Sequence, residues 1–141
     1  MIIQVMLWTN DNSDESWLAC DSDDALWYLT PALGPTSTLV LHHAARWLNA
    51  SAGLPYTFSV ETFAQMFGVM PSAMFHTLKR LQSFGLAECV TDLDNRQTWK
   101  FRTKVPPMSR RFARRMPADF LAACPYLNFD PTSQEMSHDQ G

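Results

Sequence analysis

Four residues between Pro71 and Phe84, Ser72, His76, Lys79 and Arg80, have side-chain types and spacing suited to contacting a polar or anionic partner. Ser72, His76 and Lys79 fall on one side of a helical wheel. Ala73 and Arg80 flank them. Hydroxyl, imidazole and ammonium groups donate hydrogen bonds, and the two cations attract negative charge. The pattern predicts one polar, basic face on a helix over residues 71–84.

The opposite side of this predicted helix is apolar, with Met74, Leu78 and Leu81 on one stripe. A shorter helix is expected just before it, over residues 60–67. Ser59 is a residue type that accepts hydrogen bonds from free helix N–H groups, and Gly68 suits the end of a helix. The two segments therefore predict a pair of helices that meet at a tight corner.

The spacing of this pair resembles a bacterial helix-turn-helix, in which an apolar-Ala pair precedes a Gly-apolar turn and an apolar stripe follows. The matching residues are Phe63, Ala64, Gly68, Val69, Met74, Leu78 and Leu81. Residues 85–105 look like the hairpin wing of winged helix-turn-helix DNA-binding proteins of bacteria and phages, such as the MarR and GntR types. The resemblance covers residues 36–105 and assigns no subfamily. It implies an α+β fold, mainly α with a small antiparallel hairpin wing.

The resemblance also implies which side chains contact double-stranded DNA. A helix in the major groove reads base edges, and the wing holds the phosphate backbone. The base-reading residues expected are Ser72, Ala73, His76, Lys79 and Arg80. The wing and backbone contacts expected are Arg96, Lys100, Arg102 and Lys104, with additional basic contacts from Arg110 and Arg111.

Charge is segregated along the 141 residues, although the net charge is only −3. Residues 76–115 hold ten of the eleven Lys and Arg residues and three acidic residues. Residues 1–30 hold six acidic residues and residues 116–141 hold four, and neither segment contains Lys or Arg. A local basic segment matters more for binding a polyanion than the total charge does.

The remaining elements follow from periodicity and breaking residues. We expect a short strand in residues 1–8, a helix near 23–29 that ends before Pro31, and a first winged-domain helix over 36–50. Residues 56–58 are expected to pair with a hairpin formed by 86–91 and 97–105. The second strand of this hairpin alternates, which predicts one buried face with Trp99, Phe101, Thr103 and Val105 and one basic face with Lys100, Arg102 and Lys104. The predicted organisation is an N-terminal extension (1–35), the winged domain (36–105), a C-terminal helical segment (106–125) and a mobile acidic tail (126–141).

No catalytic, cofactor or metal signature stands out. The five glycines form no phosphate-binding loop, and the three cysteines lie far apart. His42 and His43 are adjacent, so on a helix they point about 100° apart and are poorly placed to chelate one ion. No apolar run is long enough to span a membrane, and the opening residues lack a secretory leader. We therefore expect a cytoplasmic protein that is not an enzyme.

Two functions compete on this basis. The first is a sequence-specific transcriptional regulator that binds double-stranded DNA as a homodimer; the apolar segments 1–8 and 112–124 suggest the dimer contact. The alternative is a winged-helix protein-protein interaction module, a phage or host accessory factor without intrinsic DNA binding, whose protein partner contacts the N- or C-terminal segment. A small enzyme is a third and weaker hypothesis.

Overall fold

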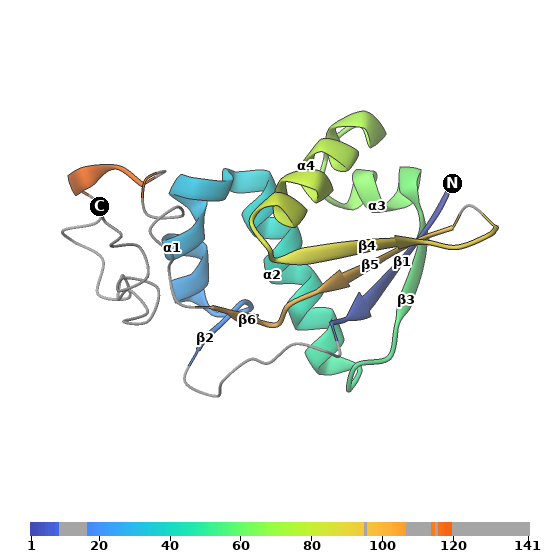
Figure 1. Ribbon diagram of the computed structural model, residues 1–141, viewed down its shortest axis with the longest axis horizontal. Coiled ribbons are helices and arrows are strands. Elements are labelled where there is room, and N and C mark those ends of the chain that lie inside the picture. The colour runs from blue at the N-terminus through green and yellow to red at the C-terminus, as the bar shows by residue number, and fades with distance from the viewer. Residues whose placement is uncertain (9–16, 95, 107–113, 115, 120–141) are drawn as a thin grey trace, which may run out of the picture.

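The computed structural model describes residues 1–8, 17–94, 96–106, 114 and 116–119, and these form an α+β fold (Figure 1). The helices of this part are α1 (Asp23–Leu33), α2 (Pro35–Ala50), α3 (Val60–Met66) and α4 (Pro71–Ser83). The main sheet contains β1 (Ile2–Leu7), β3 (Tyr56–Ser59), β4 (Ala87–Thr91) and β5 (Gln97–Phe101). A second sheet pairs β2 (Leu18–Ala19) with β6 (Lys104–Val105). None of the helices in the described ranges has the length and apolar character needed to cross a membrane.

The N-terminal strand lies inside the main sheet, whose strand order is β3-β1-β5-β4. β1 runs parallel to β5 and antiparallel to β3, while β4 and β5 form an antiparallel hairpin. The expected pairing of residues 56–58 with the hairpin was therefore wrong, because β1 lies between them. The alternation in β1 explains this: Ile3 and Val5 are fully buried, so the strand contributes to the core as well as to the ladder.

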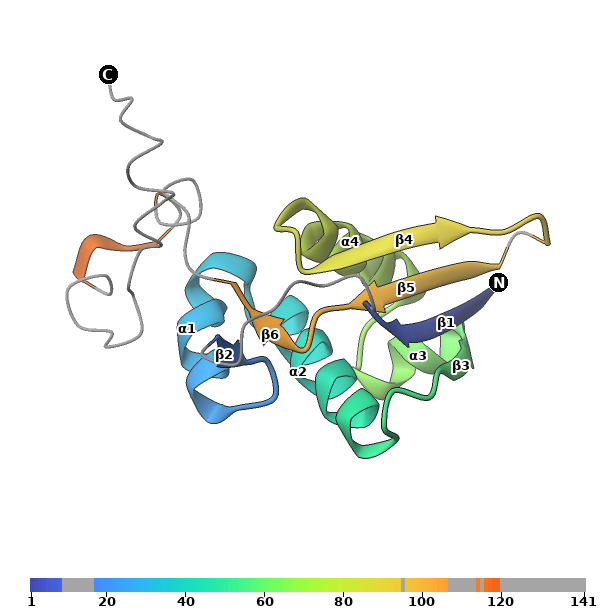
Figure 2. The ribbon, with the colours of Figure 1, turned by 60° about the horizontal axis from the view of Figure 1, so that its bottom comes forward.

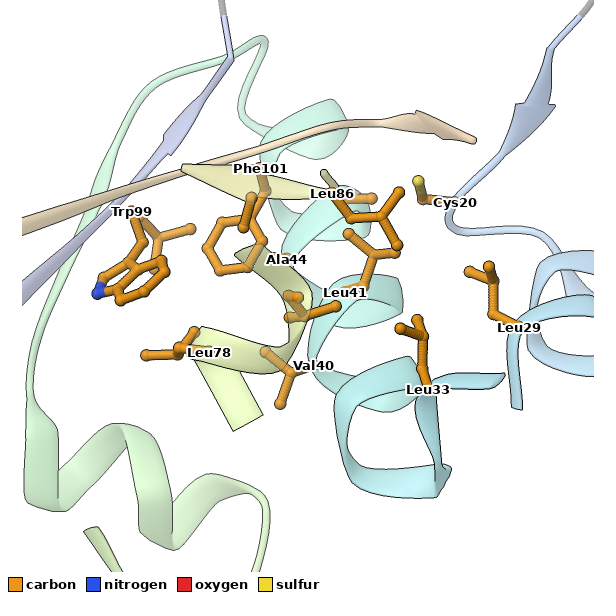
Figure 3. Close-up of a cluster of buried hydrophobic side chains, with 14 of the residues drawn as sticks. Cys20, Leu29, Leu33, Val40, Leu41, Ala44, Leu78, Leu86, Trp99 and Phe101 are labelled. Atoms are coloured by element: carbon orange, nitrogen blue, oxygen red, sulfur yellow. The ribbon is translucent and has the colours of Figure 1, made fainter. Parts of the chain in front are cut away.

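Helices α2, α3 and α4 cover one face of the main sheet (Figure 2). That face carries Ile3 and Val5 from β1 and Trp99 and Phe101 from β5, all of which are buried. The buried face predicted for residues 99 and 101 is thus confirmed. Figure 3 shows the core continuing from these rings past α2 to Leu29 and Leu33 of α1. A single hydrophobic cluster therefore joins the sheet to all four helices.

The junction between α1 and α2 is tighter than the sequence suggested. Ser22 caps α1 by accepting the N–H of Ala25 at 3.1 Å, and the helix continues through Pro31, so the expected end before Pro31 was wrong. Pro31 has no N–H to donate to the carbonyl four residues before it, so α1 lacks one helical hydrogen bond there, and two more helical residues follow. Gly34 then turns the chain with φ 84° and ψ 162°, and Pro35 opens α2.

The second strand of the hairpin is shorter than predicted. β5 ends at Phe101, and the backbone of Arg102 donates to the Leu86 carbonyl at 3.1 Å. Residues 104–105 then join the separate sheet with β2, where Val105 is buried. The hairpin therefore spans residues 87–101, and the prediction of a continuous strand to residue 105 was wrong.

The predicted boundary at residue 35 does not correspond to a structural boundary. β1 lies between two strands of the expected winged domain, and α1 contributes Ala25, Tyr28 and Leu29 to the same core. Burial of Ile3 and Val5 within the chain accounts for part of the apolar character of residues 1–8, whereas Met1 and Ile2 are 48% and 39% exposed. The dimer contact expected from this segment stays a prediction. The C-terminal helical segment falls mostly outside the described residues, and the acidic tail falls entirely outside them.

Candidate nucleic-acid interface

The corner between α3 and α4 is fixed by local hydrogen bonds. Ser59 caps α3 by accepting the N–H of Thr62 at 3.1 Å, as its position predicted. The chain leaves α3 through Gly68, whose φ is 71°, and the Val69 N–H donates to the Ala64 carbonyl at 3.1 Å. The connection is short and hydrogen-bonded, so it holds α4 at a fixed angle to α3.

The two faces of α4 are divided as the sequence predicted. Met74, Leu78 and Leu81 are fully buried beneath the helix. Ser72, His76 and Lys79 are exposed on the opposite side, while Ala73 is half-buried at its edge. Burial of three large side chains stabilises the helix by several kcal/mol, at about 1.5–3 kcal/mol each. The polar face is therefore presented to solvent by a helix that is firmly anchored.

Arg80 has a different environment from Lys79. Its Nη2 donates to the carbonyl oxygen of Ala32 at 3.0 Å, and its guanidinium carbon lies 5.9 Å from the centroid of the Phe84 ring. Ala32 is in the last turn of α1, where carbonyl groups lack helical partners and a cation is favourable. Arg80 therefore ties α4 to the end of α1, although its side chain is also exposed, and its base-reading role stays a prediction.

The hairpin tip is organised by Asp92. Its N–H donates to the Arg96 carbonyl at 3.0 Å. Its Oδ1 accepts the N–H groups of Asp94, at 3.0 Å, and of Arg96, at 2.9 Å. Such side-chain-to-backbone bonds fix a tight turn. The tip projects beyond the helices in Figure 1 and carries the exposed side chain of Arg96.

The three basic residues predicted to line one strand face are separated in the structure. Lys100 is half-exposed in β5 and lies opposite Glu88 of β4. The negative charge of Glu88 offsets part of the positive charge of Lys100. Lys104 belongs to β6, which Figure 1 shows beside α1 and away from the hairpin tip. Lys104 therefore lies outside the hairpin, and its contact with the DNA backbone stays a prediction.

Arg102 makes intramolecular contacts that the sequence did not suggest. Its Nε donates to the Gly85 carbonyl at 2.8 Å, and its guanidinium carbon lies 4.5 Å from the centroid of the Trp8 ring. The first contact satisfies a carbonyl just beyond the end of α4, and the second is a cation–π contact. Arg102, just after β5, therefore joins the residue that follows β1 to the α4–β4 turn, and its phosphate contact stays a prediction.

The adjacent histidines of α2 lie in different surroundings. The imidazole of His43 is 5.5 Å from the Phe67 ring and 6.1 Å from the Trp47 ring, measured between centroids. Burial, followed by the neighbouring His42 and Arg46, lowers the pKa of His43 below its ordinary value. The Nδ1 atom of His42 is buried and has no hydrogen-bond partner in the described part of the chain. Nor do three His, Cys, Asp or Glu residues of that part gather in a way that would hold a metal ion.

One exposed residue at the start of α4 escaped the sequence analysis. Met70 is the N-cap residue of α4 and is 71% exposed, although its side chain is large and apolar. In the sequence, Met70 comes immediately before Pro71, which indicates the start of a helix. An apolar residue at this position, where a polar capping residue is usual, was the signal that could have drawn attention to Met70. Arg110 and Arg111, the additional basic contacts predicted, lie outside the described residues.

No protein-family model, curated protein or solved structure matches the chain.

Proposed function

We propose that this protein is a sequence-specific regulator that binds double-stranded DNA through a winged helix-turn-helix. The observation that carries the proposal is the division of α4 into a fully buried apolar stripe and an exposed polar face. The major groove of B-form DNA, about 12 Å wide, admits a helix of this kind. In this arrangement Ser72, His76 and Lys79 face base edges or nearby phosphates.

The β4–β5 hairpin supplies the second contact of the proposed interface. It follows α4 directly, after the turn at Gly85, and its tip carries exposed Arg96. A cation at the end of a projecting hairpin reaches the backbone or minor groove beside the groove that α4 occupies. β1, between β5 and β3, supports the strand from which this hairpin projects.

Electrostatic attraction contributes only moderately to the proposed binding. The described residues contain eight Lys or Arg and eight Asp or Glu side chains. Arg80 and Arg102 are engaged within the chain, which leaves Lys79, Arg96 and Lys100 as the cations of the interface. Three phosphate contacts give a slope of log K against log salt of about −2.7. Affinity is then expected to fall roughly forty-fold between 50 and 200 mM salt.

The test is selection of duplexes from a randomised library by the full chain, at low and at moderate salt, followed by sequencing. We expect an enriched motif whose retention falls with salt along the slope given above. A palindromic motif indicates binding as a homodimer, and a single half-site indicates binding as a monomer. Absence of any retained duplex at low salt would refute the proposal.

A pair of variants separates the interface from general charge. Lys79→Ala removes an exposed cation from the polar face of α4, whereas Arg46→Ala removes an exposed cation from α2. We expect Lys79→Ala to weaken binding to the selected motif by about 1–3 kcal/mol if Lys79 contacts a base. Arg46→Ala is expected to leave it nearly unchanged. Equal effects would show that binding does not depend on α4.

A protein-interaction module without DNA affinity is the second candidate. It is favoured by the equal numbers of acidic and basic side chains among the described residues and by the exposed methionines Met66 and Met70, since flexible Met side chains suit protein contacts. The same selection distinguishes the two functions. Failure to retain duplex at low salt, with folded protein, would make this candidate the leading one.

A further inference from the structure

The N-terminal end of α4 combines exposed apolar surface with small side chains. Met70 is 71% exposed at the N-cap, and Ser72 and Ala73 follow Pro71 in the first turn. The large apolar residues Phe63 of α3 and Met74, Leu78 and Leu81 of α4 are instead fully buried. Met70 therefore leaves apolar surface in water where the proposed DNA contact begins.

The residue types that usually distinguish bases are missing from this end of the helix. Residues 70–78 contain no Arg, Lys, Asn, Gln, Asp or Glu. Those types form the bidentate hydrogen bonds to guanine and adenine and the acceptor contact to cytosine. The first charged residue is Lys79, in the third turn, and the next, Arg80, is bonded to the Ala32 carbonyl. Single hydrogen bonds from Ser72 and His76, together with apolar contact, are what remains.

Thymine is the base whose major-groove edge suits such a surface. Its C5-methyl group is apolar, whereas the other three bases offer only donors and acceptors in that groove. We propose that the N-terminal end of α4 recognises thymine through this methyl group. Met70 and Ala73 make the apolar contact, and Ser72 and His76 hydrogen-bond beside it. Met70 is thus a specificity-determining residue, an inference that rests on the proposed function.

The chemistry of Met70 fits this role. A thioether on an unbranched chain is polarisable and adapts its shape to an irregular apolar surface. Because the side chain is solvent-exposed before binding, covering it against a methyl group removes apolar area of both molecules from water. The contact buries the apolar Met70 side chain, so the side chain itself brings no strong hydrogen-bonding group out of water.

The test removes the methyl group without altering any hydrogen bond. In the duplex selected from the randomised library, each thymine is replaced in turn by deoxyuridine, and the dissociation constant of the full chain is measured. We expect affinity about four-fold weaker for each contacted methyl lost. This factor corresponds to about 0.8 kcal/mol for one buried methyl-sized group. Replacement of thymines outside the motif is the control for changes in duplex shape.

A matched pair of variants assigns the effect to Met70. Met70→Ala removes the proposed contact, while Met66→Ala truncates another exposed methionine, 46% accessible, at the end of α3. We expect Met70→Ala to weaken binding to the thymine duplex by three- to ten-fold. Its effect on the uracil duplex should be smaller, because the methyl group that Met70 contacts is already absent there and the two changes are not additive. Met66→Ala is expected to affect both duplexes equally and slightly. Circular dichroism confirms that each variant is folded.

The outcomes separate this inference from the proposed function. An enriched motif whose affinity does not change on uracil substitution overturns thymine recognition and leaves the regulator intact. An equal effect of Met70→Ala on both duplexes also overturns the role of Met70. No enriched motif at all refutes the regulator and this inference together.

Discussion

Arg80 and Lys79 are neighbours on α4, and the structure predicts opposite consequences for their removal. Arg80→Ala deletes a charge-assisted hydrogen bond to the Ala32 carbonyl, 3.0 Å long, and the contact with the Phe84 ring. The hydrogen bond contributes about 1.5 kcal/mol, at the lower end for a charged donor because the side chain is partly solvated. The cation–π contact adds about 0.5 kcal/mol, since 5.9 Å is near the limit of such contacts.

The expected loss is therefore about 2 kcal/mol in the free energy of unfolding, which lowers the melting temperature by roughly 4–8 °C. Urea denaturation followed by circular dichroism measures the loss. Lys79→Ala, at an exposed position of the same helix, is the control and should change stability by less than about 0.5 kcal/mol. Arg80→Met keeps the aliphatic stem and isolates the contribution of the guanidinium group.

The same two variants are expected to have the opposite order of effects on DNA affinity. Lys79→Ala is expected to weaken binding to the selected motif, and Arg80→Ala to leave the affinity of the folded fraction nearly unchanged. If Arg80→Ala were as stable as the parent protein and lost ten-fold or more in affinity, the contact with Ala32 would not be the role of Arg80. Our separation of structural from interface cations on α4 would then be wrong.

Three further predictions concern the junction, the aromatic cluster and the hairpin tip. Gly34→Ala should lower the free energy of unfolding by about 1–3 kcal/mol in urea denaturation, because φ 84° with ψ 162° is restricted to glycine. The lack of any atom within 4 Å of the added Cβ makes this a backbone cost alone. The pKa of His43 is lowered in the folded protein, so its contribution to stability is present above about pH 6.5 and lost as the pH falls towards the lowered pKa. His43→Phe should flatten this part of the stability profile, and an unchanged profile would contradict the assignment. Arg96→Ala should make the salt slope of DNA binding shallower by about 0.9, and an unchanged slope would show that the tip does not touch phosphate.

The elements with strong local signals were predictable. Gly68 and Pro71 set the corner between α3 and α4, and the apolar stripe of α4 identified its buried face, because helix period and capping depend on residues close in sequence. The alternation at Trp99 and Phe101 likewise placed the buried face of β5. The candidate interface of α4 followed from this local pattern.

What the sequence alone determined was thus the presence of the four helices in the described part of the chain, the faces of α4 and the position of the hairpin tip. Only the tertiary structure decided that β1 enters the sheet between β3 and β5, because strand pairing joins residues far apart in the chain and any apolar strand satisfies the same pattern. The contacts of the Arg80 and Arg102 side chains likewise depended on the tertiary structure. A long cationic side chain is equally compatible with solvent, phosphate or a nearby carbonyl, and the choice depends on which unpaired carbonyl the fold brings within 3 Å.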